Sequence, residues 1–263
     1  MRRPRPEAYF VGSAVFHYLG PAFAVLLFAR VEPLGVAWLR ILTAAVVFAL
    51  WRRPWNALRE RAVLAWGAVL AAMNCCFYIA IDRLPLATVA AIEFLPVVAL
   101  AAAGARTPRN AAALGLAVPG AYVLTGVHLS GAPTGIVFAF ANALLFAAYI
   151  VCADRAAKRG LGIDGLAGAM LVAAILVTPV GGTGVDAIAV AAGAGVGISS
   201  SVIPYLLDQL ALARLPRATY GLMVSILPAT ATVVGLVVLA QVPTLRDLGG
   251  IGLVAGGVSL HRR

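Results

Sequence analysis

Charged residues are scarce in this chain. Of its 263 residues, 11% are Asp, Glu, Lys or Arg, whereas 62% are hydrophobic and the mean hydropathy is +0.98. A water-soluble fold of this size needs roughly 25% charged residues to cover its surface. The shortage of charge therefore excludes ordinary globular, disordered and collagen-like proteins. It leaves a protein that crosses a membrane several times.

Cysteine and the common catalytic motifs are also rare or missing. The three cysteines have neither disulfide-framework nor zinc-site spacing, and the sequence contains no G-x-x-x-x-G-K-[ST], H-E-x-x-H or G-x-S-x-G motif. We therefore expect no cofactor, no metal, no enzymatic activity and no ATP-driven pumping by this chain. The distant alternative is a membrane-bound redox enzyme that uses the adjacent Cys75 and Cys76, although neighbouring side chains on a helix point about 100° apart.

The intervals between charged residues measure the membrane spans. A bilayer core about 30 Å thick needs roughly 20 apolar residues in a helix. The 44 residues between Arg109 and Asp154 carry no charge and are divided by the turn-forming segment 130–134, so they hold two spans. The other intervals begin at Glu7, Glu32, Arg61, Arg83, Asp164, Asp186, Arg217 and, for the last span, near Pro243. This pattern predicts an all-α membrane protein with ten transmembrane helices.

The basic residues indicate the orientation of these spans. The net charge of +10 would suggest a nucleic-acid partner in a soluble protein, but here the basic residues stand between apolar runs. In the ten-span arrangement, 16 Lys and Arg fall on one side and 3 on the other, with Arg40 inside a span. The positive-inside rule then places both chain termini in the cytoplasm, with an uncleaved first span. We expect the lipid bilayer, not nucleic acid, to surround the chain.

A weak internal repeat divides the spans into five and five. Residues 83–88 (RLPLAT) recur as 214–219 (RLPRAT), and a Leu-Pro pair follows each copy, at Leu95-Pro96 and Leu227-Pro228. Because five is odd, two similar halves would have opposite orientations, as in many secondary transporters. We predict two inverted five-helix repeats, residues 1–129 and 130–263. A chance match between such common residue types is the alternative.

The same stretches resemble a known family. Met73-Asn74, Phe77-Tyr78, residues 91–94 (AIEF), Pro204-Tyr205 and residues 221–228 are similar to segments of bacterial drug/metabolite transporters with two EamA repeats, above all the inner-membrane threonine and homoserine exporters. The resemblance implies the ten-helix fold, a place in the bacterial inner membrane and export of a small molecule. Relatives tend to have Glu where this chain has Leu227 and Gln241, which puts the substrate in question.

Glu93 and Arg40 are the charges that topology explains least. A charge in the bilayer core costs roughly 3 kcal/mol or more unless it is paired or hydrated. Glu93 lies about 12 Å inside the fourth span, where it suits an ammonium group or an exchangeable proton; a protonated structural Glu is the alternative. Arg40 suits a substrate carboxylate, although its long side chain can also extend to the interface.

Several polar residues lie in spans that line the central cavity of the transporters this chain resembles. They complete the predicted substrate or proton site, although interhelical hydrogen bonding alone would explain each of them. They are His17, Asn74, Tyr78, Asn142, Tyr149, Ser200, Tyr205 and Asp208. Pro96, Pro119, Pro204 and Pro228 each leave a backbone carbonyl without its helical donor and allow bends.

Together these features predict a secondary transporter that exports a small amphipathic metabolite by alternating access with proton coupling. A threonine-like or homoserine-like amino acid is the first candidate, and a multidrug or lipophilic-cation exporter of the same fold is the alternative. The protein is expected to be a monomer or a homodimer. The sequence does not define the substrate, the direction of transport, the coupling ion or the stoichiometry.

Overall fold

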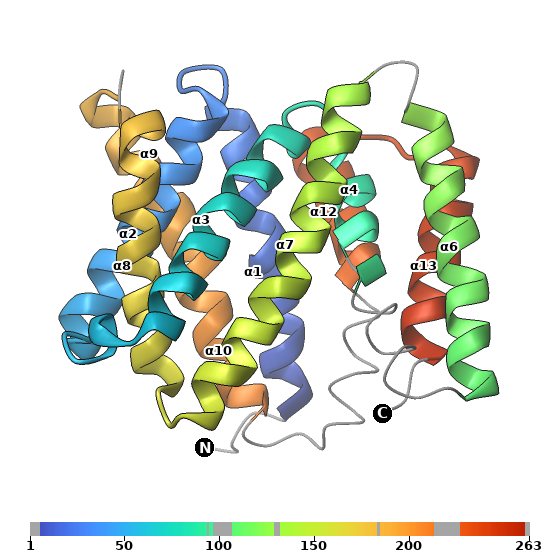
Figure 1. Ribbon diagram of the computed structural model, residues 1–263. Helices are drawn as coiled ribbons and strands as arrows, with labels where there is room; N and C mark the ends of the chain where they lie inside the picture. Colours follow the sequence, from blue (N-terminus) through green and yellow to red (C-terminus); the bar gives the residue numbers. More distant parts are fainter. Residues whose placement is uncertain are drawn as a thin grey trace, which may run out of the picture.

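The computed structural model describes residues 6–93, 95–96, 107–128, 132–182, 185–212 and 227–260. These residues are almost entirely helical, with no strand among them, which confirms the predicted all-helical class. Figure 1 shows the bundle. In chain order the elements are α1 (Pro6–Leu27), α2 (Pro33–Arg52), a short 3-10 helix η1 (Ala57–Arg59), α3 (Arg61–Ile81), α4 (Leu86–Glu93), α6 (Pro108–His128), α7 (Pro133–Lys158), α8 (Gly162–Gly181), α9 (Ala187–Gly197), a π turn η2 (Ile198–Val202), α10 (Ile203–Leu212), α12 (Leu227–Leu239) and α13 (Leu245–Leu260).

Six helical segments of the described chain are long and apolar enough to cross a membrane. They are Ala8–Leu27, Pro33–Arg52, Arg61–Ile81, Pro133–Ala156, Gly162–Gly181 and Ala187–Leu207. The other predicted spans contain α4, α6, α12 and α13, which are shorter or less apolar over the described residues. The protein therefore has several membrane-spanning helices, and ten spans remain a prediction.

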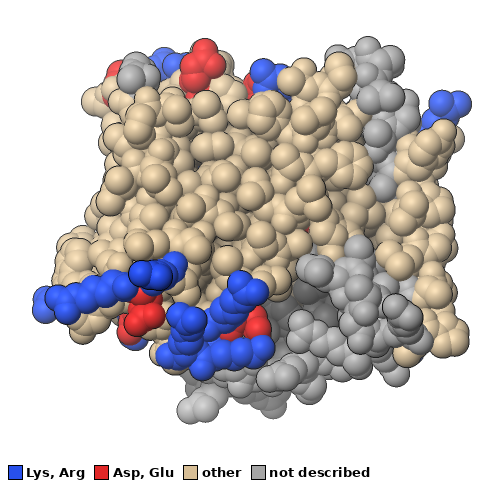
Figure 2. Space-filling model, viewed as in Figure 1, with Lys and Arg blue, Asp and Glu red and all other residues tan. Residues whose placement is uncertain are grey.

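Apart from the buried Arg40 and Glu93, the described charged side chains lie toward the two ends of the bundle. Figure 2 shows a broad band of one face without Lys, Arg, Asp or Glu, between charged upper and lower edges. The first residues of α1 and the last residues of α13 lie at the lower end (Figure 1). Ion pairs join elements at that end: Arg52 Nε lies 2.7 Å from Asp164 Oδ1, and Arg159 Nη1 lies 3.6 Å from Glu60 Oε2. This distribution is the one expected of a helical bundle in a bilayer.

Close helix crossings depend on glycine. A Cβ at Gly193 would lie 2.5 Å from Leu39 Cδ1, and one at Gly197 would lie 2.9 Å from the Arg40 carbonyl, so α9 packs directly on α2. Between α6 and α13, a Cβ at Gly257 would lie 2.6 Å from the Ala113 carbonyl. The α9–α2 contact fixes the depth of Arg40 opposite the π turn.

Candidate functional site

Arg40 is a buried cation that joins three helical segments. It lies on α2, seven residues after Pro33, and is 8% exposed. Its Nε donates to Ser201 Oγ at 2.9 Å, Nη1 donates to Asn74 Oδ1 at 2.9 Å, and Nη2 donates to the Ser200 carbonyl at 3.1 Å. All three acceptors are neutral, and no described carboxylate forms an ion pair with Arg40. The guanidinium is therefore fixed in place while its charge stays uncompensated by the described residues.

The partners of Arg40 are themselves held in place. Asn74 Nδ2 donates to the Leu70 carbonyl at 2.9 Å, which turns the amide oxygen of Asn74 toward Arg40. The Tyr78 ring lies beneath the guanidinium, with its centroid 5.8 Å from Arg40 Cζ. Ser200 Oγ donates to the Val196 carbonyl at 2.6 Å. Helix α3 and the π turn thus hold the cation from two sides.

Glu93 is a buried acid with a single hydrogen-bond partner among the described residues. It is the last residue of α4 and is 6% exposed. Asn142 Nδ2, on α7, donates to Glu93 Oε1 at 3.1 Å. Asn142 is itself fully buried, and its Oδ1 has no hydrogen-bond partner among the described residues. A donor in this position, such as water or a substrate ammonium, would satisfy both side chains.

The structure brings the cation and the acid near each other. Arg40 and Glu93 interact electrostatically, although no ion pair between them occurs in the described part of the chain. Helix α1 contributes a side chain toward each: His17 is within electrostatic range of Arg40, and Tyr18 of Glu93. The Tyr18 hydroxyl is fully buried and has no hydrogen-bond partner among the described residues. Opposite charges at two sides of one region suit a small molecule that carries both signs.

Sequence reasoning missed two members of this group. Ser201 received no separate role, although it belongs to a run of three serines. Tyr18 was overlooked, although a hydroxyl-bearing aromatic next to His17 in the middle of an apolar span was a usable signal. Seven predicted site residues do gather here: His17, Arg40, Asn74, Tyr78, Glu93, Asn142 and Ser200.

Three predicted site residues are placed elsewhere or are not defined. Tyr149 stacks on Phe146 with ring centroids 6.2 Å apart, and the ring centroids of Tyr205 and Phe48 lie 6.4 Å apart. Both tyrosines pack against the apolar core formed by α2, α3 and α8, nearer the lower end than Asn142 and Ser200. Asp208 belongs to α10, but its side chain lies outside the described part of the structure.

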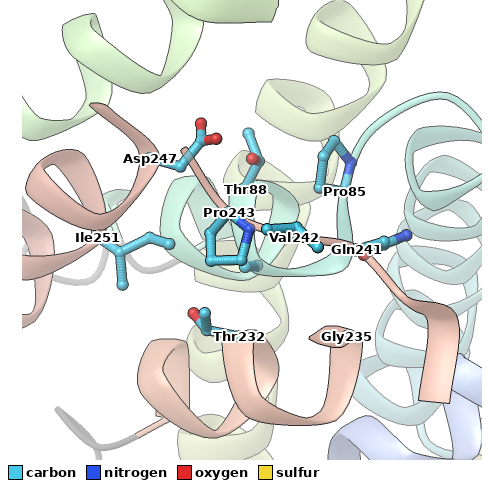
Figure 3. A pocket seen from close by; sticks show the side chains of 10 residues that line it. Pro85, Thr88, Thr232, Gly235, Gln241, Val242, Pro243, Asp247 and Ile251 are labelled. Carbon is cyan, nitrogen blue, oxygen red and sulfur yellow. The ribbon is translucent and has the colours of Figure 1, made fainter. Parts of the chain in front are cut away.

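A small pocket lies at the upper end, between α4, α12 and α13 (Figure 3). Its volume is about 150 Å³, and Pro85, Thr88, Thr232 and Asp247 are among its lining residues. Asp247 Oδ2 accepts from the backbone N and Oγ1 of Thr244 at 2.9 and 2.7 Å, so the acid caps α13. Two polar groups of this pocket, Asp247 and Gln241, therefore cap helix starts, and we place the candidate site at Arg40 and Glu93.

The two positions that depart from the resembled family have structural roles. Gln241 Oε1 accepts from the Leu86 backbone N at 3.1 Å and caps the start of α4. Leu227 packs among apolar residues of the core. The cysteines also act as packing groups: all three are free thiols, and Cys75 and Cys152 pack against the apolar core.

Comparisons with known proteins identify the family. A model of the EamA-like transporter family matches residues 133–262. The threonine/homoserine exporter RhtA of Escherichia coli (strain K12) is 31% identical over 247 residues, which cover 89% of this chain and 83% of that protein. The chain belongs to the EamA-like transporter family.

Other matches agree with this EamA-like assignment. The threonine/homoserine exporter RhtA of Salmonella typhimurium (strain LT2) is 32% identical over 237 residues, covering 86% of this chain and 80% of that protein. One crystal structure of a protein shares the fold with a TM-score of 0.67 and 21% identity, covering 98% of this chain and 96% of that chain. The predicted family resemblance is confirmed, and the chain is a membrane transport protein of the EamA type.

Proposed function

We propose that this EamA-like protein exports a small amino acid from the bacterial cytoplasm. The observation that carries the proposal is the pair of buried opposite charges: Arg40, held by neutral acceptors, and Glu93, held by Asn142. A substrate carboxylate would compensate Arg40, and a substrate ammonium would meet Glu93. Because the two charges interact electrostatically, one small molecule that carries both groups could contact both of them.

Threonine and homoserine are the first substrates to test. The relatives that match most of the chain carry the name threonine/homoserine exporter. Leu227 and Gln241 stand where relatives tend to have acids; Gln241 caps α4, and Leu227 packs against the apolar cluster that also contains Tyr18 and Tyr78. We therefore expect the charged contacts to a zwitterion to be retained, with any change of specificity arising from side-chain packing.

The packing pattern supports ten spans in two inverted repeats. In the first proposed repeat the helices are α1, α2, α3, α4 and α6. Their counterparts in the second repeat are, in the same order, α7, α8, the continuous pair α9 and α10, α12 and α13. The contacts of α1 with α10 and α12 then correspond to those of α7 with α3 and α4, and α2–α9 corresponds to α8–α3. The pairs α2–α8, α4–α12 and α6–α13 correspond to themselves. Such a pattern is expected of a pseudo-two-fold axis in the membrane plane. The proposed boundary at residues 129 and 130 lies outside the described residues.

The orientation follows from charge. Eight Lys and Arg of the described residues belong to lower-end segments, namely Arg52, Arg53, Arg59, Arg61, Arg109, Arg155, Lys158 and Arg159. Only Arg30, Arg83 and Arg246 belong to upper-end segments. By the positive-inside rule the lower end, with both chain termini, faces the cytoplasm of a bacterial inner membrane. Alternating access would then open the Arg40–Glu93 region to each side in turn.

Replacing Glu93 with Gln tests the proposal. Purified protein in liposomes would be assayed for threonine transport driven by a pH gradient and for threonine counterflow without a gradient. Loss of both activities is expected if Glu93 binds the ammonium, and loss of the gradient-driven activity alone is expected if Glu93 exchanges a proton. Glu60→Gln is the matched control, because Glu60 pairs with Arg159 at the lower surface. Wild-type transport in both assays by the Glu93 variant would refute the mechanism.

Export of a lipophilic cation is the alternative. It is favoured by the aromatic cluster of Trp66, Phe146 and Tyr149, in which Trp66 and Tyr149 ring centroids lie 5.7 Å apart. Aromatic faces attract cations, and such a substrate needs no carboxylate partner. The same liposomes loaded with a fluorescent lipophilic cation would distinguish the two substrates.

A further inference from the structure

The eighth predicted span contains an irregularity directly opposite Arg40. Residues Ile198–Val202 form a π turn between α9 and α10, with the Ile203 backbone N bonded to the Ile198 carbonyl. Single π turns inside α-helices often occur at functional sites. Pro204 lies two residues after the end of the π turn and has no N–H, so the usual α-helical donor to the carbonyl four residues earlier is missing. That carbonyl belongs to Ser200.

Arg40 supplies the missing donor. Its Nη2 donates to the Ser200 carbonyl at 3.1 Å, and its Nε donates to Ser201 Oγ at 2.9 Å. A regular helix with an amino acid other than proline at position 204 would satisfy the Ser200 carbonyl within its own backbone. Pro204 thus removes one backbone donor that would otherwise compete with the guanidinium for the Ser200 carbonyl.

The surroundings fix this arrangement. A Cβ at Gly20 would lie 2.2 Å from Ser200 Cβ, so α1 crosses the π turn without space for a side chain. Ser13 Oγ, also on α1, donates to the Pro204 carbonyl at 3.2 Å. A guanidinium has five N–H groups, and hydrogen bonds to the described residues use three of them. The other two N–H groups have no such bond in the described part of the chain and can receive a ligand.

We infer that Pro204 and Ser201 are positioning residues that aim the free N–H groups of Arg40 at a substrate carboxylate. Neither residue needs to touch the substrate. The inference rests on the proposed function, because it assigns a determinant of carboxylate recognition to the same site. Pro204 acts by leaving the Ser200 carbonyl available, and Ser201 acts by accepting from Nε, so both set the orientation of one planar group.

The test compares threonine with threoninamide, which lacks the carboxylate charge. Each compound would compete with labelled threonine in counterflow by reconstituted wild-type, Pro204→Ala and Ser201→Ala proteins. Wild type should prefer threonine. In both variants the ratio of the affinity for threonine to the affinity for threoninamide should fall about tenfold, which is the effect of one hydrogen bond to a charged group. The affinity for threoninamide itself should change little. A uniform loss of affinity for both compounds would indicate a structural role and overturn the inference.

Two matched controls complete the design. Ser199→Ala removes a neighbouring hydroxyl that bonds only to the Val196 carbonyl, and Pro119→Ala removes a proline from α6. Both should keep the wild-type preference. If Pro204→Ala does not yield a monodisperse protein, Ser201→Ala decides alone. An unchanged preference in Ser201→Ala refutes the inference while the proposed function stands; wild type without a preference for threonine refutes both.

Discussion

The surroundings of Arg40 and Glu93 differ sharply. Three hydrogen bonds and an aromatic ring hold Arg40, and its partners come from α3 and the π turn. One hydrogen bond from Asn142 holds Glu93, and the Tyr18 hydroxyl and Asn142 Oδ1 nearby have no partner among the described residues. Both charges are almost equally buried. Among the described residues, more hydrogen bonds therefore hold the cation than hold the acid.

This difference assigns different tasks to the two charges. A guanidinium is always charged, so burial does not neutralise it and fixed acceptors must compensate its desolvation. A carboxyl group can lose or gain a proton, so few fixed partners are needed. We infer that Arg40 supplies constant recognition of an anionic group, whereas Glu93 supplies the step that changes during a transport cycle.

Arg40→Ala should have the largest effect. It removes three interhelical hydrogen bonds, each worth about 1 kcal/mol in a membrane protein, so stability should fall by about 3 kcal/mol. Threonine transport should disappear. Thermal unfolding in detergent and counterflow in liposomes would measure the two effects. A lipophilic-cation exporter should tolerate this change. The alternative function would therefore be favoured if Arg40→Ala still transported the cation and the wild type transported no amino acid.

Arg40→Lys separates charge from geometry. Lysine keeps the positive charge but offers one nitrogen in place of three, so it cannot reach Asn74, Ser200 and Ser201 together. We expect most of the protein to fold and threonine affinity to fall about tenfold or more. If Arg40→Lys bound threonine as tightly as the wild type, positive charge alone would suffice for recognition. The fixed geometry of Arg40 would then no longer distinguish it from Glu93.

Glu93→Asp should have a smaller effect that spares stability. Shortening the side chain by one methylene breaks the 3.1 Å hydrogen bond from Asn142 but keeps the carboxyl group. Because this is the only hydrogen bond to Glu93 from the described residues, the melting temperature should change by less than it does in Arg40→Ala. Gradient-driven transport should fall about tenfold, since the distance to the transported group increases. If Glu93→Asp lost more stability than Arg40→Ala, Glu93 would be the more firmly held of the two charges, contrary to the proposal.

The helices were easier to predict than the site. Charge-free intervals located the segments that became α1, α2, α3, α7 and α8, because a missing charge is visible residue by residue. The partners of Arg40 were not predictable in the same way. Ser201 is 161 residues away in the chain, and its contact depends on how α9 crosses α2.

The depth of a residue in the membrane can be estimated from its position in the sequence, but the direction in which its side chain points cannot. Tyr149 and Tyr205 lie on helices whose other polar residues join the site, yet both tyrosines pack among apolar groups. A shift of a few residues along a helix changes the face that a side chain occupies. Glycine contacts show the same limit. Gly252 and Gly256 have the spacing on α13 that often permits close helix contact, but a Cβ at Gly252 would meet nothing within 4 Å, whereas Gly257 contacts α6 closely.

Tyr18→Phe is the most delicate test of the Glu93 side. The hydroxyl has no partner among the described residues, so its removal should leave the melting temperature unchanged or slightly raised. If a substrate or water binds between Tyr18 and Glu93 during transport, the Michaelis constant for threonine should rise about threefold, with little change in maximal rate. Phe16→Leu on the same helix serves as the control for altered packing. If Tyr18→Phe had wild-type kinetics, Tyr18 would not take part in transport, and only Glu93 and Asn142 would be left as residues that change partners during the cycle.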